Sequence, residues 1–246
     1  MTPRANALLR LLAVQAAWTY ERMSGIGVGH AAAPLLRELY ANRSTEERRA
    51  AVARSAEFFN SHPYLAGVAV GAVVRAERDE VPGAAIVRLR TALSGPLGSL
   101  GDQLVWAGEV PLLIGLALAA TPWFGAWTVL MVVLVHNVLR FWLTAWGLDI
   151  GLREGLGVGA ALQRSWLPAA AARAQSAAAF AIGLAIPIVA WTLLRGAGVS
   201  VTTGVIGGML LGAALALSRF AQERMTGLRF GVGLLLIASF IVGVLR

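Results

Sequence analysis

The sequence predicts an all-α integral membrane protein with N-terminal amphipathic or interfacial helices, a broken re-entrant segment and then about five membrane-embedded helices. Two observations support this fold class. Apolar residues make up 57% of the 246 residues and the mean hydropathy is strongly positive, more than a soluble domain of this size can bury. In addition, five apolar segments follow residue 103, and each approaches the roughly 20 residues that cross a bilayer.

The charge pattern fits the same class. The net charge is +8, every Lys/Arg position is arginine, and the arginines concentrate before residue 91. An excess of basic residues on the cytoplasmic side explains this pattern. No nucleic-acid-binding motif accompanies the charge, so we expect no nucleic-acid partner. The chain contains no cysteine, which excludes disulfides, thiolate nucleophiles and cysteine-based metal sites.

The first forty residues predict helices of a water-facing or interfacial region. Residues 5–23 place apolar side chains at helical spacing, which is typical of an amphipathic helix packed on protein or lying in the membrane interface. Gly25, Gly27 and Gly29 follow, and we interpret them as a flexible connection. Pro34 then predicts the start of a short helix.

A second helix is predicted from a capping box. Ser44 and Glu47 have the spacing at which each side chain accepts a hydrogen bond from the other's backbone. The helix should end near residue 60, because Pro63 disfavours helix at the residue before it. Residues 64–74 are apolar but reach only about half-way across a hydrocarbon core. They predict a re-entrant piece, an interfacial piece or a buried helix.

Residues 94–106, S-G-P-L-G-S-L-G-D-Q-L-V-W, separate a basic region from an apolar one. Three glycines and one proline within eight residues disfavour a continuous helix. Asp102 would then cap a half-helix that Pro111 kinks. We therefore predict two regions: a cytoplasmic or interfacial helical region over residues 1–93, with a short re-entrant segment, and a membrane-embedded helical domain over residues 94–246.

The distribution of arginine predicts a topology for the apolar segments. These segments cover residues 104–120, 124–146, 174–194, 201–217 and 228–245. With the N-terminus cytoplasmic, residues 121–123 and 196–200 lie outside, and the arginine-bearing links lie inside, as the positive-inside rule requires. The C-terminus then ends outside. Small residues in the last two segments favour close helix packing within lipid.

Four segments, in order along the chain, resemble those of one family, the IID membrane subunit of mannose/fructose/sorbose-type sugar phosphotransferase systems. The first is Y-E-R-M at residues 20–23, and the second is E-F-F-N at residues 57–60 followed by Pro63. The third is G-P-L-G-S-L-G-D at residues 95–102 followed by Trp106. The fourth is N-V-L-R at residues 137–140 followed by Gly147. Together they cover about residues 10–155.

The resemblance implies a transporter subunit with no catalytic residue, metal or cofactor of its own. Such a subunit pairs with a IIC membrane subunit in the bacterial inner membrane, and the soluble IIA and IIB phosphocarrier proteins phosphorylate the incoming sugar. A trimer of IIC–IID pairs is expected by analogy. The segments that resemble the family nominate residues for the substrate path or the IIC contact, namely Gly95, Pro96, Gly98, Gly101, Asp102, Trp106, Glu109, Asn137 and Arg140.

Two departures from the family pattern leave other functions open. The family often has proline where this chain has Gln103, and Arg-Pro where it has Val110-Pro111. A membrane scaffold or regulatory protein that binds IIC without transporting is therefore an alternative. An independent channel is a third, although broken helices need a protein partner for their freed backbone groups.

The histidines and the membrane-region charges complete the candidate residues. His30, His62 and His136 lie far apart in sequence without a metal-ligand pattern. We interpret His62 as a cap and His136 as a hydrogen-bonded helix contact. Because an ionised group inside a membrane must be paired or hydrated, we expect Arg140 to pair with Asp102 or Glu109.

Overall fold

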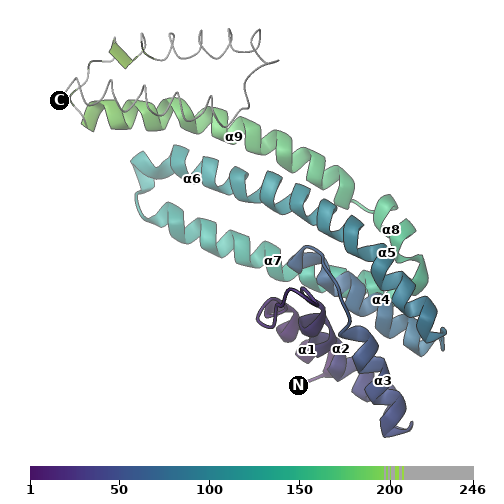
Figure 1. The fold of residues 1–246 in the computed structure, drawn as a ribbon. Helices are drawn as coiled ribbons and strands as arrows, with labels where there is room; N and C mark the ends of the chain where they lie inside the picture. The colour runs from purple at the N-terminus through teal and green to yellow at the C-terminus, as the bar shows by residue number, and fades with distance from the viewer. Residues whose placement is uncertain (197, 199, 201–202, 205–206, 208–246) are drawn as a thin grey trace. The chain divides into compact units, whose positions relative to one another are not determined.

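The computed structural model describes residues 1–196, 198, 200, 203–204 and 207, and its elements are helices joined by turns (Figure 1). The chain divides into two compact units, Met1–Ile188 and Val189–Arg246. In chain order the elements are α1 (Pro3–Leu12), α2 (Gly25–Leu39), α3 (Thr45–Ser55), η1 (Pro63–Leu65), α4 (Ala66–Arg78), α5 (Gly83–Gly101), η2 (Asp102–Glu109), α6 (Val110–Phe124), α7 (Trp127–Glu154), η3 (Gly155–Gly157), α8 (Val158–Arg164) and α9 (Leu167–Gly196). The predicted segments 201–217 and 228–245 fall outside the described residues, apart from residues 203, 204 and 207.

The N-terminal helix is shorter than predicted. Helix α1 begins after Thr2, whose hydroxyl accepts from the Ala5 amide, and it ends at Leu12. Turns follow up to Met23, which adopts a left-handed φ of 50° and is hydrogen-bonded to Thr19. A single helix over residues 5–23 is therefore wrong beyond Leu12. The buried face of α1 packs on protein, mainly on α2.

The glycines at residues 25, 27 and 29 do not form a flexible connection. They build the first turns of α2, where the neighbouring backbone leaves no room for a side chain. A Cβ atom on Gly27 would lie 1.9 Å from the carbonyl oxygen of Val14, and one on Gly25 would lie 2.0 Å from that of Glu57. Glycine is needed here for close approach. Pro34 lies inside α2 instead of starting a helix.

Helix α3 confirms the capping box. The Glu47 amide donates to the Ser44 hydroxyl at 3.1 Å, and the Ser44 amide donates to the Glu47 carboxylate at 2.9 Å. The hydrogen bonds from Ser44 hold the pKa of the Glu47 carboxyl below its usual value. The helix ends at Ser55, about one turn before the residue predicted from Pro63.

Helix α4 is the buried centre of the first unit. All nine residues from 66 to 74 are buried, so a helix covered by protein is the correct interpretation of residues 64–74. It crosses the C-terminal half of α7 at glycines on both helices. A Cβ on Gly71 would lie 2.3 Å from the Leu148 carbonyl oxygen, and one on Gly151 would lie 2.3 Å from that of Val68. Facing small residues let the two backbones touch.

The predicted break at residues 94–106 is wrong. Residues 83–124 form one continuous helical stretch of 42 residues, with Pro96 inside α5 and Asp102 within the helix, where its side chain caps nothing. The chain instead widens into the π-helical segment η2 (Asp102–Glu109). In a regular α-helix the Pro111 ring would clash with the carbonyl four residues earlier, and the wider turn directly before it relieves this conflict. The boundary at residues 93/94 lies inside α5.

Helices α6 and α7 form an antiparallel hairpin that runs side by side in Figure 1. Gly125, with φ of 54°, makes the turn between them. Helix α9 lies against η2 and α6 at small residues: a Cβ on Gly108 of η2 would lie 2.7 Å from the Ala174 Cβ, and one on Gly115 of α6 would lie 2.8 Å from the Ala181 backbone. In the part of the chain that the structure describes, two helical stretches, residues 83–124 and 127–196, are long and apolar enough to cross a membrane.

Candidate functional site

Three of the four segments that carry the family resemblance meet in space. The Phe59 amide donates to the Arg22 carbonyl at 3.2 Å, and Met23 forms a bridge with Phe59. The Asn60 amide donates to the Ser94 hydroxyl at 3.1 Å, and this hydroxyl donates in turn to the Asn60 carbonyl. The second segment therefore links the turn after α1 to the start of the glycine-rich stretch.

A buried arginine supports the same loop. Arg90 on α5 is 1% exposed and donates to the carbonyl oxygens of Ser55 at 3.0 Å and Glu57 at 2.9 Å. Its guanidinium lies 5.5 Å from the ring centroid of Phe59. These carbonyls belong to the last residue of α3 and to the loop after it, where backbone oxygens lack helical partners, so the cation stabilises the loop.

The glycine-rich stretch packs against η1 at its C-terminal end, near Gly101, whereas Gly95 near its N-terminal end faces open space among the described residues. A Cβ on Gly101 would lie 2.2 Å from the Cβ of His62, so glycine is required there. Gly95 has no atom within 4 Å of such a Cβ, and Gly98 only a distant contact with Ser61. Of these glycines, Gly101 positions η1 against α5, whereas Gly95 leaves surface available for contact. Pro96 lies beside Gly95 within α5.

A chain of polar side chains joins η1, η2 and α7. The Nδ1 atom of His136 on α7 lies 3.0 and 3.1 Å from the two carboxylate oxygens of Glu109, the last residue of η2. Its Nε2 atom lies 2.9 Å from the hydroxyl of Tyr64 on η1. The side chains of Glu109 and His136 are 12% and 24% exposed. This Glu109–His136–Tyr64 chain provides both partners that the imidazole ring can use.

Arg140 does not pair with Asp102 or Glu109 in the described residues. It lies one helical turn after His136, donates to the Leu12 carbonyl oxygen at the end of α1, and places its guanidinium 5.3 Å from the Tyr64 ring centroid. The expected ion pair is therefore replaced by a carbonyl contact and a cation–π contact. Arg140 still lies next to the polar chain, through Tyr64.

Trp106 and His62 extend this cluster towards the glycine-rich stretch. The His62 ring centroid lies 4.8 Å from that of Tyr64 and 6.0 Å from that of Trp106. Trp106 is 58% exposed, and Asp102, one turn earlier, is also exposed. Asn137 is exposed on α7 and donates to the Val133 carbonyl of its own helix. The structure thus links Trp106, Glu109 and Arg140 through His62, Tyr64 and His136. Among the described residues, the side-chain hydrogen bond of Asn137 stays within its own helix.

His62 caps a helix, as predicted, although it does so at the start of η1. Its Nδ1 atom accepts from the Tyr64 amide at 3.3 Å. Burial lowers the pKa of the His62 imidazole to about 4, and the nearby Asp102 carboxylate offsets only part of this. The ring is therefore neutral near pH 7.

We expect the stability of the protein to fall between pH 6.5 and pH 4. In the unfolded chain His62 takes up a proton below pH 6.5, whereas in the folded protein it stays neutral down to about pH 4. The free energy of unfolding therefore falls by up to about 3 kcal/mol as the pH drops through this window. Thermal unfolding of wild type and His62→Asn at pH 7 and pH 4.5 measures the effect. Asparagine keeps the cap without titrating, and an equal loss in both proteins would contradict the assignment.

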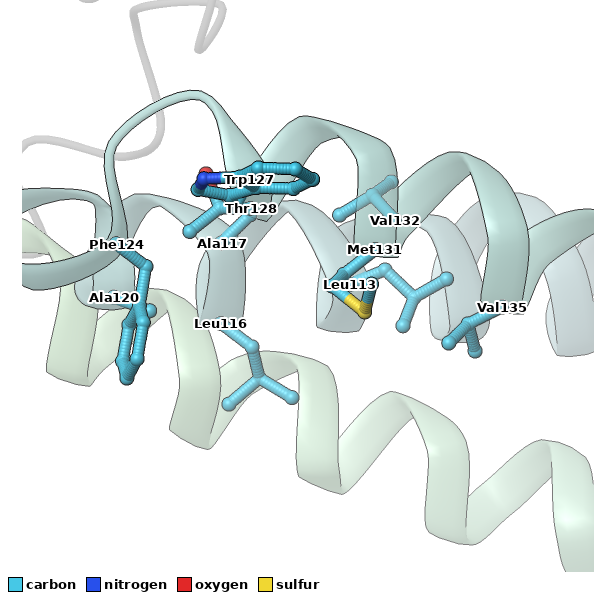
Figure 2. A pocket seen from close by; sticks show the side chains of 10 residues that line it. All are labelled: Leu113, Leu116, Ala117, Ala120, Phe124, Trp127, Thr128, Met131, Val132 and Val135. Carbon is cyan, nitrogen blue, oxygen red and sulfur yellow. The ribbon is translucent and has the colours of Figure 1, made fainter.

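The pocket between α6 and α7 is apolar and lies apart from the polar chain. Figure 2 shows it near the hairpin turn, where Phe124, Trp127 and Leu113 contribute to its walls. Its volume is about 330 Å³. The Thr128 hydroxyl in its lining donates to the Gly125 carbonyl at 2.8 Å and is thereby satisfied. This surface suits hydrocarbon and offers no chemistry for catalysis.

Sequence reasoning missed Tyr64, which it placed only within an apolar run. The hydrogen-bonded helix contact expected for His136 is confirmed, although its partners Glu109 and Tyr64 were not predicted. A signal was present: a histidine inside an apolar span needs a partner for each ring nitrogen. No group of three or more His, Asp or Glu side chains suited to a metal ion occurs among the described residues.

The fold and the site define a helical membrane protein with a polar cluster in its long apolar helices. The chain belongs to the family described as the PTS system mannose/fructose/sorbose family IID component, whose model matches residues 3–189. The predicted family is thereby confirmed.

Relatives and solved structures agree with this assignment. The mannose-specific EIID component of Escherichia coli K12 is 27% identical over 62% of this chain and 56% of its own length. The sorbose-specific EIID component of Klebsiella pneumoniae is 27% identical over 62% and 57%, and the fructose permease IID component of Bacillus subtilis is 25% identical over 63% and 55%. The chain therefore matches little more than half the length of these relatives.

Two solved structures share the fold. A structure titled as a membrane protein aligns with a TM-score of 0.71 at 22% identity, over 96% of this chain and 94% of that one. A chain from the mannose transporter ManYZ in complex with microcin E492 aligns with a TM-score of 0.58 at 20% identity, over 98% and 96%. At these identities the two structures show a common fold.

Proposed function

We propose that this chain is a IID subunit that pairs with a IIC membrane subunit in the bacterial inner membrane, and that the pair translocates a sugar phosphorylated by the soluble IIA and IIB proteins. The observation that carries the proposal is the Glu109–His136–Tyr64 chain. It places ionisable groups within the long apolar helices, and such groups at membrane depth most often serve a transport path or a partner.

Tryptophans on α7 support a membrane position for this cluster. Trp127, 68% exposed, begins the helix, and the rings of Trp142 and Trp146 each lie 5.0 Å from that of Trp166 in tilted arrangements. Counted along the helix, Trp127 lies about 22 Å from Trp142 and about 29 Å from Trp146, close to the hydrocarbon thickness that interfacial aromatic residues bracket. His136 falls between these levels.

The exposed first half of α7 supports a partner. Val129, Leu130, Met131, Val133 and Leu134 are each at least half exposed, so this surface faces lipid or another membrane protein. Residues 1–93 form the cytoplasmic or interfacial region in this proposal and residues 94–246 the membrane domain, with the N-terminus cytoplasmic and the C-terminus outside. Three IIC–IID pairs form the assembly, by analogy with the family.

The nominated residues then divide into two groups. Gly95, Pro96 and Gly98 contribute open surface on α5 for the IIC contact, and Asn137 contributes an exposed amide on α7. Gly101, Trp106 and Asp102 lie next to His62. Glu109 belongs to the polar chain, and Arg140 contacts Tyr64 of that chain. A scaffold that binds IIC without transporting stays the second candidate, because Gln103 and Val110 replace residues common in the family.

Replacing Arg140 with alanine separates these functions. We expect Arg140→Ala to reduce phosphoenolpyruvate-driven sugar uptake in vesicles that contain the chain, its IIC partner, IIA and IIB, because the cation next to Tyr64 is lost. Co-purification with IIC is measured in parallel. If Arg140→Ala loses uptake but still co-purifies with IIC, the transport function is supported. If the wild-type chain co-purifies with IIC but gives no uptake, the scaffold is supported. Unchanged assembly and unchanged uptake would remove Arg140 from both functions.

A further inference from the structure

The first two segments of the family resemblance form a surface to which the proposed function gives no role. Residues 18–23 and 57–60 are held together by Met23, whose backbone is paired with Thr19 on one side and with Phe59 on the other. Because paired residues have Cα atoms at most about 5.5 Å apart, Thr19 and Phe59 lie within about 11 Å of each other. We call this surface the aromatic corner and define it by its three outward rings, those of Trp18, Tyr20 and Phe58.

The three side chains of the aromatic corner are exposed although they are large and mostly apolar. Trp18 is 45% exposed, Tyr20 82% and Phe58 54%, whereas the adjacent Phe59 is 1% exposed and belongs to the core. The rings of Trp18 and Tyr20 meet edge to face, with their centroids 5.0 Å apart. This exposure leaves the indole N–H and the phenol hydroxyl open to partners outside the described chain.

Charged residues beside the rings limit how deep the aromatic corner can lie in a membrane. Glu21 and Arg22 directly follow Tyr20 and are exposed, and Arg22 donates to the Ala56 carbonyl at 3.4 Å. Ionised groups avoid the hydrocarbon core, whereas tryptophan and tyrosine concentrate at the level of the lipid headgroups. Exposed rings next to charges therefore fit the membrane–water interface better than hydrocarbon or bulk water.

Contacts with α7 place the aromatic corner near one end of the apolar part of that helix. The Leu12 carbonyl, shortly before the first segment, accepts from Arg140. The Tyr64 hydroxyl, shortly after the second segment, lies 2.9 Å from His136. Along the helix axis, Arg140 lies about 3 Å from Trp142 and His136 about 9 Å from it. Both segments are thus attached close to the tryptophans that mark one membrane interface in the proposed function.

We propose that the aromatic corner lies in this membrane–water interface and binds phospholipid headgroups, with its rings against the glycerol and ester groups. The inference rests on the membrane position proposed for α7 and is independent of sugar transport. It adds that residues 1–93 touch the bilayer through a turn, while α1 itself packs on protein. A protein partner would have to desolvate Glu21 and Arg22, which is costly, whereas hydrated headgroups leave both charges solvated.

The absence of cysteine from the sequence allows a direct test, because one introduced cysteine can carry the only fluorophore on this chain. Tyr20→Cys and Phe58→Cys are labelled separately in the full chain, which is reconstituted alone and with its IIC partner in phosphatidylethanolamine–phosphatidylglycerol vesicles. The quenchers are iodide in the water and lipids spin-labelled either near the headgroup or near the end of the acyl chain. We expect the headgroup-level label to quench both positions at least about twofold more than the chain-end label.

Two further positions calibrate the depth, and wild type treated with the same fluorophore gives the background. Leu134→Cys, on the exposed first half of α7, should be quenched most by the chain-end label, and Arg49→Cys, exposed on α3, by iodide alone. Thermal stability checks that each variant is folded, and the two corner positions lie on different segments, so each tests the inference without the other.

The alternative outcomes contradict different statements. Quenching of the aromatic corner by iodide alone, or most strongly by the chain-end label, would overturn the inference. Protection from all quenchers once IIC is present would assign the corner to that partner and overturn it too. If Leu134→Cys does not respond to the chain-end label, the membrane position of α7 in the proposed function is wrong, and this inference falls with it. If Leu134→Cys responds as expected and the corner does not, only this inference fails.

Discussion

Replacing Gly71 with leucine is expected to prevent the protein from folding. A Cβ at this position would lie 2.3 Å from the Leu148 carbonyl oxygen and 2.6 Å from the Leu152 amide nitrogen. These are backbone atoms of α7, which cannot move aside as a side-chain end can. The substitution must force α4 and α7 apart along their whole contact, so we expect a loss of at least about 3 kcal/mol.

The reciprocal substitution should be equally severe. A Cβ on Gly151 would lie 2.3 Å from the Val68 carbonyl oxygen, so Gly151→Leu breaks the same contact from the other helix. Thermal unfolding and proteolysis of the chain purified in detergent measure both variants. Gly159→Leu is the matched control, because nothing lies within 4 Å of a Cβ there. Near-wild-type unfolding of Gly71→Leu would show that the two helices do not pack through their backbones.

These glycines show what the sequence could and could not predict about the fold. The capping box at Ser44 was predicted correctly because its hydrogen bonds join residues three apart. The glycines at residues 25–29 were misinterpreted as flexible because their packing depends on Val14 and Glu57, which only the folded chain brings near. The G-x-x-x-G spacing of Gly67 and Gly71, by contrast, was a readable signal for close helix packing.

The helix through residues 94–106 shows how packing overrides local propensity. Three glycines and Pro96 disfavour helix locally, yet Gly101 lies within α5 and fits closely against His62, and Gly108 in the following η2 fits against Ala174. The π-helical turns then accommodate Pro111. The sequence shows the low helix propensity of these glycines, but it does not show the tertiary contacts that offset this loss of helix stability.

The sequence predicted which residues belong to the candidate site better than it predicted which of them contact each other. Glu109 and Arg140 were singled out because ionisable groups in apolar segments need partners. Their partners turned out to be His136 and the Leu12 carbonyl with the Tyr64 ring. These partners lie far from Glu109 and Arg140 in the sequence. The register of α7 against η2 decides which side chain reaches Glu109.

Removing the carboxylate of Glu77 should cost about 3–5 kcal/mol of stability, because it breaks a buried ion pair. The Glu77 side chain is 3% exposed, accepts from Arg54 Nη2 at 2.8 and 3.0 Å, and accepts from the Tyr40 hydroxyl at 2.7 Å. Glu77→Ala leaves the guanidinium and the phenol without this acceptor. Glu80→Ala is the matched control: its pair with Arg43 is solvent-exposed, so we expect a loss of about 1 kcal/mol or less.

The Tyr40 hydroxyl gives an independent readout of the same cluster. Burial, followed by the hydrogen bond to Glu77, raises the pKa of Tyr40 to about 12. The unfolded chain releases this proton near pH 10 and the folded protein retains it, so the contribution is complete below pH 10 and lost as pH rises towards 12. Glu77→Gln should lower the alkaline titration midpoint of Tyr40, followed by phenolate absorbance against a Tyr40→Phe reference. An unchanged midpoint, together with wild-type stability of Glu77→Ala, would mean that Arg54 and Tyr40 do not depend on this carboxylate.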